Sequence, residues 1–164
     1  MKRFLLLIIC SFAYSAILHV PSEYSTIQEA INNHIQGDTV LVAPGTYEIS
    51  DNISIQSSNL SIISSEGSEQ TFINATNINS VNHTFLVYDS DIFIKGFTIG
   101  QSNNERILID NSISHLEDIK FTDELGYIDK DNIRGEFIYL NNSKDATMKN
   151  IYVENLVLEF ASYN

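Results

Sequence analysis

Six acidic side chains crowd one stretch of the chain and could hold a cation. They are Glu117, Asp118, Asp123, Glu124, Asp129 and Asp131. Because Ca²⁺ prefers carboxylate oxygens, Asp123, Asp129 and Asp131 are its candidate ligands. The spacing fits a calcium loop poorly, since Ile133 stands where a further oxygen donor would be needed. We therefore favour a solvated acidic loop, expect no cofactor, and keep calcium as the alternative.

The sequence predicts no catalytic residue. Glycoside hydrolysis needs two carboxylates at a set separation, and ester hydrolysis needs an activated nucleophile with oxyanion donors. We find neither arrangement. The histidines lie apart without the spacing of a zinc site, and two arginines are interpreted as surface residues. These six residues are His19, His34, His83, His115, Arg106 and Arg134.

A polar pair recurs at three expected turns, Asp89-Ser90, Asn111-Ser112 and Asn141-Asn142. Stacked carboxylates and amides could bind a sugar or calcium. The alternative is an internal ladder, in which each side chain hydrogen-bonds the neighbouring turn, as amide ladders do between stacked parallel strands. We favour the ladder, because the polar groups of buried turns need partners.

Aromatic side chains could form a platform for a sugar ring. Four phenylalanines alternate with the expected interior positions, so core packing is the favoured interpretation for them. They are Phe85, Phe97, Phe121 and Phe137. The tyrosines that we expect to be exposed are better platform candidates, namely Tyr88, Tyr127 and Tyr152.

Composition limits the class of protein. The chain has 164 residues and a net charge of −12, which argues against a nucleic-acid partner, because affinity for phosphate depends on basic side chains. Charged residues make up 18% and hydrophobic residues 43% of the chain, too apolar a balance for a disordered chain. The 24 Ile, 19 Ser and 17 Asn residues predict short strands joined by polar turns.

The first residues have the pattern of a signal peptide. Lys2 and Arg3 precede an apolar run over residues 4–10, and Ala13-Tyr14-Ser15 provides small residues for cleavage. The run is too short to span a bilayer, which needs about 20 residues. We therefore assign residues 1–15 as a signal peptide and expect a secreted or cell-surface protein without a membrane span.

One helix is expected between residue 16 and residue 37, after a short N-terminal strand. Ser25 can cap it, with Gln28 completing a capping box, and Gly37 can end it. Four apolar residues follow helical spacing: Ile27, Ala30, Ile31 and Ile35. After Asp38 the apolar period changes from helical to alternating, which predicts short strands.

An internal repeat organises the rest of the chain. Residues 85–90 align with 107–112 at a shift of 22, and the same shift places residues 94, 97 and 99 on 116, 119 and 121. A third copy begins at residues 137–142, and after a two-residue insertion it continues through Ala146, Met148, Ile151 and Val153. Strand-only repeats of this length are typical of a solenoid. Residues 38–164 are therefore predicted to form an all-β, parallel β-helix.

Residues 24–31 (YSTIQEAI) and 37–47 (GDTVLVAPGTY) resemble the N-terminal cap and first coil of right-handed parallel β-helix proteins of the pectin-lyase-like superfamily. Residues 59–73 and 92–99 resemble the coils that follow. The resemblance implies a right-handed β-helix with an N-terminal capping α-helix. It does not specify an activity, since the superfamily includes pectate lyases, pectin methylesterases, polygalacturonases and exported surface proteins.

Two functional hypotheses follow. The first is an exported, non-catalytic β-helix for surface display, adhesion or glycan binding, with an extracellular polysaccharide or cell-surface glycan as its partner. The alternative is the N-terminal fragment of a polysaccharide lyase, esterase or glycoside hydrolase. Apolar alternation continues through Leu156, Leu158 and Phe160 without a cap. We therefore expect a longer protein or, if the chain is complete, end-to-end self-association.

Overall fold

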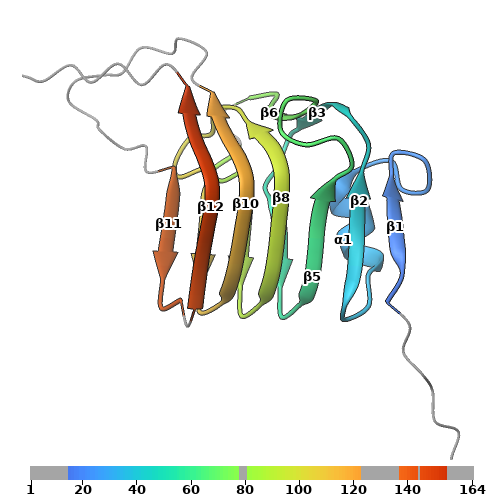
Figure 1. Cartoon of the computed structure of the whole chain (residues 1–164), viewed down its shortest axis with the longest axis horizontal. Helices are drawn as coiled ribbons and strands as arrows, with labels where there is room; N and C mark the ends of the chain where they lie inside the picture. The colour runs from blue at the N-terminus through green and yellow to red at the C-terminus, as the bar shows by residue number, and fades with distance from the viewer. Residues whose placement is uncertain (1–14, 78–80, 123–136, 144, 155–164) are drawn as a thin grey trace, which may run out of the picture.

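The computed structural model describes residues 15–77, 81–122, 137–143 and 145–154. In this part of the chain strands predominate and every strand pair is parallel. The strands stand side by side from β1 to β12, with one short helix beside the first of them (Figure 1). The predicted predominance of strands is confirmed, and the parallel pairing is compatible with a parallel β-helix.

The strands form two sheets. The larger sheet has the order β1-β2-β5-β8-β10-β12. Its strands are β1 (Ile17–Val20), β2 (Asp38–Val42), β5 (Asn59–Ser64), β8 (Asp91–Ile99), β10 (Ile113–Thr122) and β12 (Asp145–Glu154). Strands β3 (Gly45–Ile49) and β6 (Thr71–Ala75) pair with each other, and β6 also pairs with β8. The second sheet contains β4 (Ile53–Gln56), β7 (Phe85–Tyr88), β9 (Ile107–Asp110) and β11 (Ile138–Asn141), in the order β11-β9-β7-β4.

The predicted shift of 22 residues sets the register between several neighbouring strands. Ile107 lies beside Phe85 in the second sheet, and Ile113 lies beside Asp91 in the larger sheet. Strands β1, β2 and β5 pair with the same offset. Because parallel strands in this register keep equivalent positions on one face, the repeat stacks its apolar side chains in rows.

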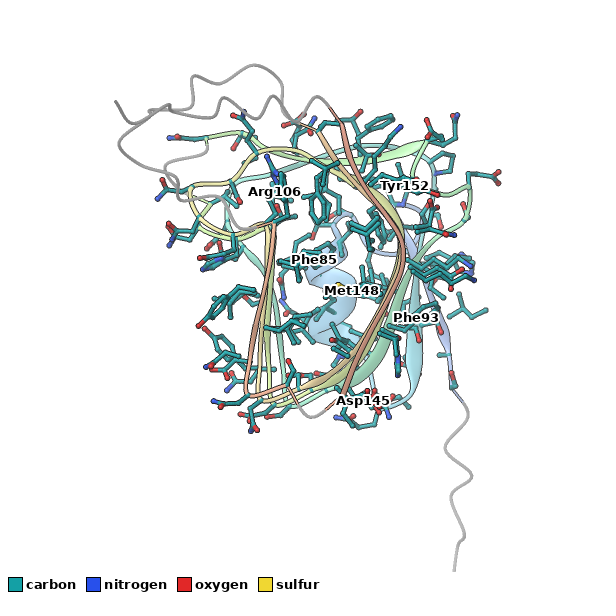
Figure 2. The ribbon with its side chains drawn as sticks, turned by 60° about the vertical axis from the view of Figure 1, so that its left-hand side comes forward. Phe85, Phe93, Arg106, Asp145, Met148 and Tyr152 are labelled. Carbon is teal, nitrogen blue, oxygen red and sulfur yellow. The ribbon has the colours of Figure 1, made fainter. Side chains whose placement is uncertain are left out.

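These rows form the core between the two sheets. Val40, Ile62, Ile94 and Leu116 follow one another across four strands and are all buried. The next member of the row, Met148 on β12, is 46% exposed, because β12 is the last strand of this sheet among the described residues. Phe85 and Met148 both lie on the inner side of the sheets (Figure 2).

A left-handed residue in the middle of each long strand shifts the inward alternation by one position. Gly96, Asp118 and Asn150 have φ values of 84°, 54° and 54°. As a result Ile94 and Phe97 are both fully buried although they are three positions apart, whereas simple alternation would place one of them outside. The apolar pattern of the repeat therefore includes a bend in each long strand.

The register of β11 corrects the expected third copy. The alignment placed Phe137 on Ile107, but Ile138 lies beside Ile107 and Tyr139 lies beside Leu108. The inserted segment before β12 is accordingly one residue shorter than expected, and the predicted pairing of β12 is confirmed. Either register would place apolar side chains in the core, because Phe137 and Tyr139 alternate with Ile138 and Leu140. A one-residue slip exchanges the faces, and the observed register leaves Tyr139 40% exposed and half-buries Ile138.

The N-terminal helix is α1 (Ile27–Asn33), and its cap lies one residue later than expected. Thr26, not Ser25, is the N-cap, and its hydroxyl accepts a hydrogen bond from the Glu29 N–H at 3.0 Å. The Glu29 carboxylate accepts from both the N–H and the hydroxyl of Ser25. Glu29 therefore takes the role that the sequence assigned to Gln28, whose side chain bonds the Ser54 backbone instead.

The apolar face of α1 packs against the first strands. Ile27, Ala30 and Ile31 are buried in the core, as predicted. Ile35 was expected on the same face but is 55% exposed, because the helix ends at Asn33. The helix therefore covers the apolar side chains at the β1 end of the core.

Candidate functional site

The calcium candidates Asp123, Asp129 and Asp131 lie outside the described residues, as do Tyr127 and Arg134. Asp118, from the same acidic stretch, has a structural partner. Its carboxylate accepts hydrogen bonds from the N–H and the hydroxyl of Ser68 at 3.1 and 2.8 Å. In the ranges that the structure describes, no three His, Cys, Asp or Glu side chains are grouped to hold a metal ion.

Glu117 belongs to a row of charged side chains on the outer face of the larger sheet. Register places it between Lys95 on β8 and Lys149 on β12, whose Nζ atoms lie 3.2 and 3.4 Å from its Oε1. Hydrogen bonding to Lys95 is the main cause that lowers the pKa of Glu117, and Lys149 adds to it against the opposing effect of desolvation. A carboxylate held ionised in this way is poorly suited to act as a general acid near neutral pH.

A second outer row contains groups that could contact a ligand. Phe93, His115 and Thr147 occupy equivalent positions on β8, β10 and β12, and His115 Nδ1 lies 2.6 Å from Thr147 Oγ1. The Phe93 ring is half-buried and lies on the outer side of the ribbon (Figure 2). This row was not predicted, although strand alternation combined with the 22-residue shift indicates the pairing of Phe93 with His115.

The predicted turn ladder is confirmed, and its buried part consists of serines. Ser90 Oγ accepts from the Ser58 N–H at 3.2 Å and donates to the Tyr88 carbonyl at 2.6 Å. In the next copy, Ser112 Oγ accepts from the Ser90 N–H at 3.0 Å and donates to the Asp110 carbonyl at 2.7 Å. Each buried hydroxyl is thus satisfied within the stack.

The outer part of the ladder consists of acids and amides. Asn111 Nδ2 donates to Asp89 Oδ1 at 2.5 Å, and Asn141 Nδ2 donates to Asp110 Oδ1 at 3.0 Å. Asn141 therefore stacks on Asp110 and not on Asn111 as expected, because β11 is displaced by one residue. Asn142 has a φ of 47°, like the 49° of Asn111, so it occupies the equivalent turn position. These polar groups bond one another, which favours a structural role for the turn stack.

The phenylalanines lie in the core, as predicted. Phe85, Phe97 and Phe121 are fully buried, and Phe137 packs half-buried against them. Tyr88 and Tyr152 are 36% and 51% exposed, also as predicted. They lie on strands of different sheets, β7 and β12, and therefore do not form one platform.

Arg106 is not the surface residue that the sequence suggested. It is 8% exposed, and its guanidinium carbon lies 4.8 Å from the centre of the Phe137 ring and 5.8 Å from that of Phe121. A guanidinium over an aromatic face is stabilised by the ring quadrupole. The burial of Arg106 depends on Phe137, which belongs to the following repeat copy, so a single copy of the sequence does not show it.

The histidines lie apart, as predicted, and three of them contact nearby oxygen atoms through Nδ1. His34 is 2.5 Å from the Ile31 carbonyl, and His83 is 2.8 Å from the Glu105 carbonyl. His115 contacts Thr147 in the outer row. Each of these histidines contacts a different partner, and among the described residues they do not define one site.

No helix within the described ranges is long and apolar enough to cross a membrane.

Comparison with known proteins identifies no family for this chain. The chain matches no family model, no curated protein and no solved structure. The likeness to the pectin-lyase-like superfamily therefore rests on the residues quoted for it.

Proposed function

We propose that this chain forms a right-handed parallel β-helix that is exported and binds glycans without catalysis. The parallel strands, the 22-residue register and α1 at one end of the core support this proposal. The signal-peptide pattern of residues 1–15 supports export to the cell surface or the medium. Surface display and adhesion follow from the same arrangement if the glycan belongs to a cell.

The outer row of Phe93, His115 and Thr147 carries the proposal. The Phe93 ring would contact the apolar face of a sugar, and the polar groups in the same row would set the orientation of the sugar. The neighbouring row at Lys95 and Glu117 adds charges of both signs. A sugar has both an apolar ring face and hydroxyl groups, so this outer face suits it.

A glycan array with the full chain tests the proposal. We expect binding to fall in Phe93→Ser and to persist in Tyr139→Ser, a matched loss of an exposed aromatic residue from the second sheet. Equal binding by both variants would remove the support for this face. Export is tested separately by expressing the chain with its own N-terminus and sequencing the secreted product, which should begin at Ala16.

The second candidate function is the N-terminal part of a polysaccharide-active enzyme. The resemblance of residues 24–31 and 37–47 to the cap and first coil of such enzymes supports it. In that case the protein that contains this chain should release reducing or unsaturated sugars from pectin. Absence of any released sugar or methanol, together with intact glycan binding, would decide for the non-catalytic proposal.

A further inference from the structure

The outer row that contains Phe93 extends over neighbouring strands of the larger sheet from β2 to β12. Strand register places the equivalent residues of β2 and β5 in line with the three residues already described. In order along the sheet, the row consists of Thr39, Ser61, Phe93, His115 and Thr147. These strands stand side by side along the direction in which the copies stack (Figure 1). Because neighbouring strands lie about 4.8 Å apart, the row is about 19 Å long.

Most members of this row carry a group that can form hydrogen bonds with a sugar. Thr147 is exposed, and the other four side chains are half-buried on the outer face. Among the described residues, the hydroxyl groups of Thr39 and Ser61 bond no other group of the protein. The contact between His115 Nδ1 and Thr147 Oγ1 at 2.6 Å orients the imidazole ring. The other ring nitrogen, Nε2, is therefore available to a ligand.

Charges of opposite sign flank the row on its two sides. On one side, the amines of Lys95 and Lys149 both contact the Glu117 carboxylate. On the other side, Asp91 and Asp145 are exposed in the neighbouring outer positions of β8 and β12. An anionic chain on the row would be repelled by the two aspartates, and a cationic chain would be repelled by the two lysines. The flanking charges therefore favour an uncharged ligand.

We infer that the outer row binds a linear, uncharged polysaccharide in an extended conformation, laid across the strands with about one sugar unit per strand. This inference rests on the proposed glycan-binding function of the same face. The separation of neighbouring strands is close to the length of one sugar unit in an extended chain, so successive units contact successive members of the row. One unit packs its carbon face on the Phe93 ring, and the adjacent units bond Ser61 and His115. Backbone pairing sets the row before the ligand binds, which limits the entropic cost of binding.

Isothermal titration calorimetry of the full chain tests the length, shape and charge of the ligand with four oligosaccharides. They are cellobiose, cellopentaose, maltopentaose and a pentamer of galacturonate. We expect cellopentaose to bind at least about tenfold more tightly than cellobiose, because each added hydrogen bond contributes about fivefold. Maltopentaose has the same sugar units in a curved chain, so it should bind about as weakly as cellobiose. The galacturonate pentamer should bind more weakly than cellopentaose, because the aspartates repel its carboxylates.

A matched pair of variants tests whether the ligand extends to the β2 end of the row. Thr39→Val removes one hydroxyl group there and should weaken cellopentaose binding by about fivefold. It should leave cellobiose binding unchanged, because two sugar units reach only the positions next to Phe93. Thr46→Val on β3 is the control, since Thr46 is exposed and lies outside the row. This control should leave the binding of both sugars unchanged.

Several results would overturn the inference. They are equal affinities for cellobiose and cellopentaose, for the two glucose pentamers, or for the charged and uncharged pentamers, and equal affinities of the two valine variants for cellopentaose. If the glycan array still shows binding that depends on Phe93, the proposed function survives such a result. Silence of the array together with no binding of any oligosaccharide would refute both the inference and the proposed function.

Discussion

Replacement of Ser90 by alanine tests whether the serine ladder stabilises the stacked strands. Ser90 is 6% exposed, and its hydroxyl accepts from the Ser58 N–H while donating to the Tyr88 carbonyl. The variant leaves the buried Ser58 N–H without this acceptor. The Tyr88 carbonyl keeps a second hydrogen bond, from the Ser57 N–H at 3.1 Å. The loss is therefore confined to one buried donor and one side-chain bond.

The expected loss of stability follows from this one unpaired donor and one lost hydrogen bond. A buried N–H left without a partner costs about 1–3 kcal/mol, so we expect Ser90→Ala to lower the free energy of unfolding by about 2 kcal/mol. Ser54→Ala is the matched control, because Ser54 is exposed on β4. Surface changes of this kind stay within about 0.5 kcal/mol. Urea unfolding followed by circular dichroism measures both variants against wild type, with equal slopes required for comparison.

The same reasoning applies one copy further along the chain. Ser112→Ala removes the acceptor of the Ser90 N–H, while the Asp110 carbonyl keeps a bond from the Asp89 N–H at 3.2 Å. We therefore expect a loss of similar size. If Ser90→Ala and Ser112→Ala both unfold at the same urea concentration as Ser54→Ala, the ladder does not stabilise the stack and the argument from buried donors is refuted.

Three further predictions concern the helix, a strand bend and the charged row. Ile31→Asp places a charge on the buried face of α1, at a position that is 4% exposed, so the midpoint of thermal unfolding should fall sharply. An unchanged midpoint would contradict the role of α1 in covering the core. Gly96→Ala should cost about 1–3 kcal/mol in urea unfolding, because φ is 84° and an added Cβ would lie 3.1 Å from Gly67 Cα; a loss below about 0.5 kcal/mol would be too small for such a clash. The pKa of Glu117 is lowered in the folded state from 4.5, so its stabilising effect is present above that value and is lost as the pH falls through the lower folded pKa. Melting of wild type and Glu117→Gln should accordingly differ at neutral pH and converge in acid, and a constant difference would argue against the pairing.

Much of the architecture could be predicted from the residues alone. The alternation of Val40, Val42 and later apolar pairs predicts strands, and the shift of 22 residues predicts which positions stack. Ile27, Ala30 and Ile31 predict the buried face of α1. These features depend on the local alternation of apolar residues and on the period of the repeat, and both can be read directly from the order of the residues.

The candidate sites could be predicted only in part. The turn ladder and the buried phenylalanines follow from aligning the copies. The cap at Thr26 was misassigned because Ser25-Gln28 and Thr26-Glu29 have the same spacing, and the bond between Gln28 and Ser54 joins positions far apart in the sequence. The register of β11 was misassigned because both sets of alternating residues are apolar there.

Tertiary structure decided the burial of Arg106 and the charged row at Glu117. Each of them joins residues that are far apart in the sequence. The period of the repeat predicts that the copies stack. The spatial neighbours of a given side chain depend in addition on the bends, insertions and register between copies. The order of the residues therefore determined the strands and their apolar rows. Three-dimensional packing determined which polar and charged groups contact each other, because those contacts join segments of the chain that no local sequence pattern connects.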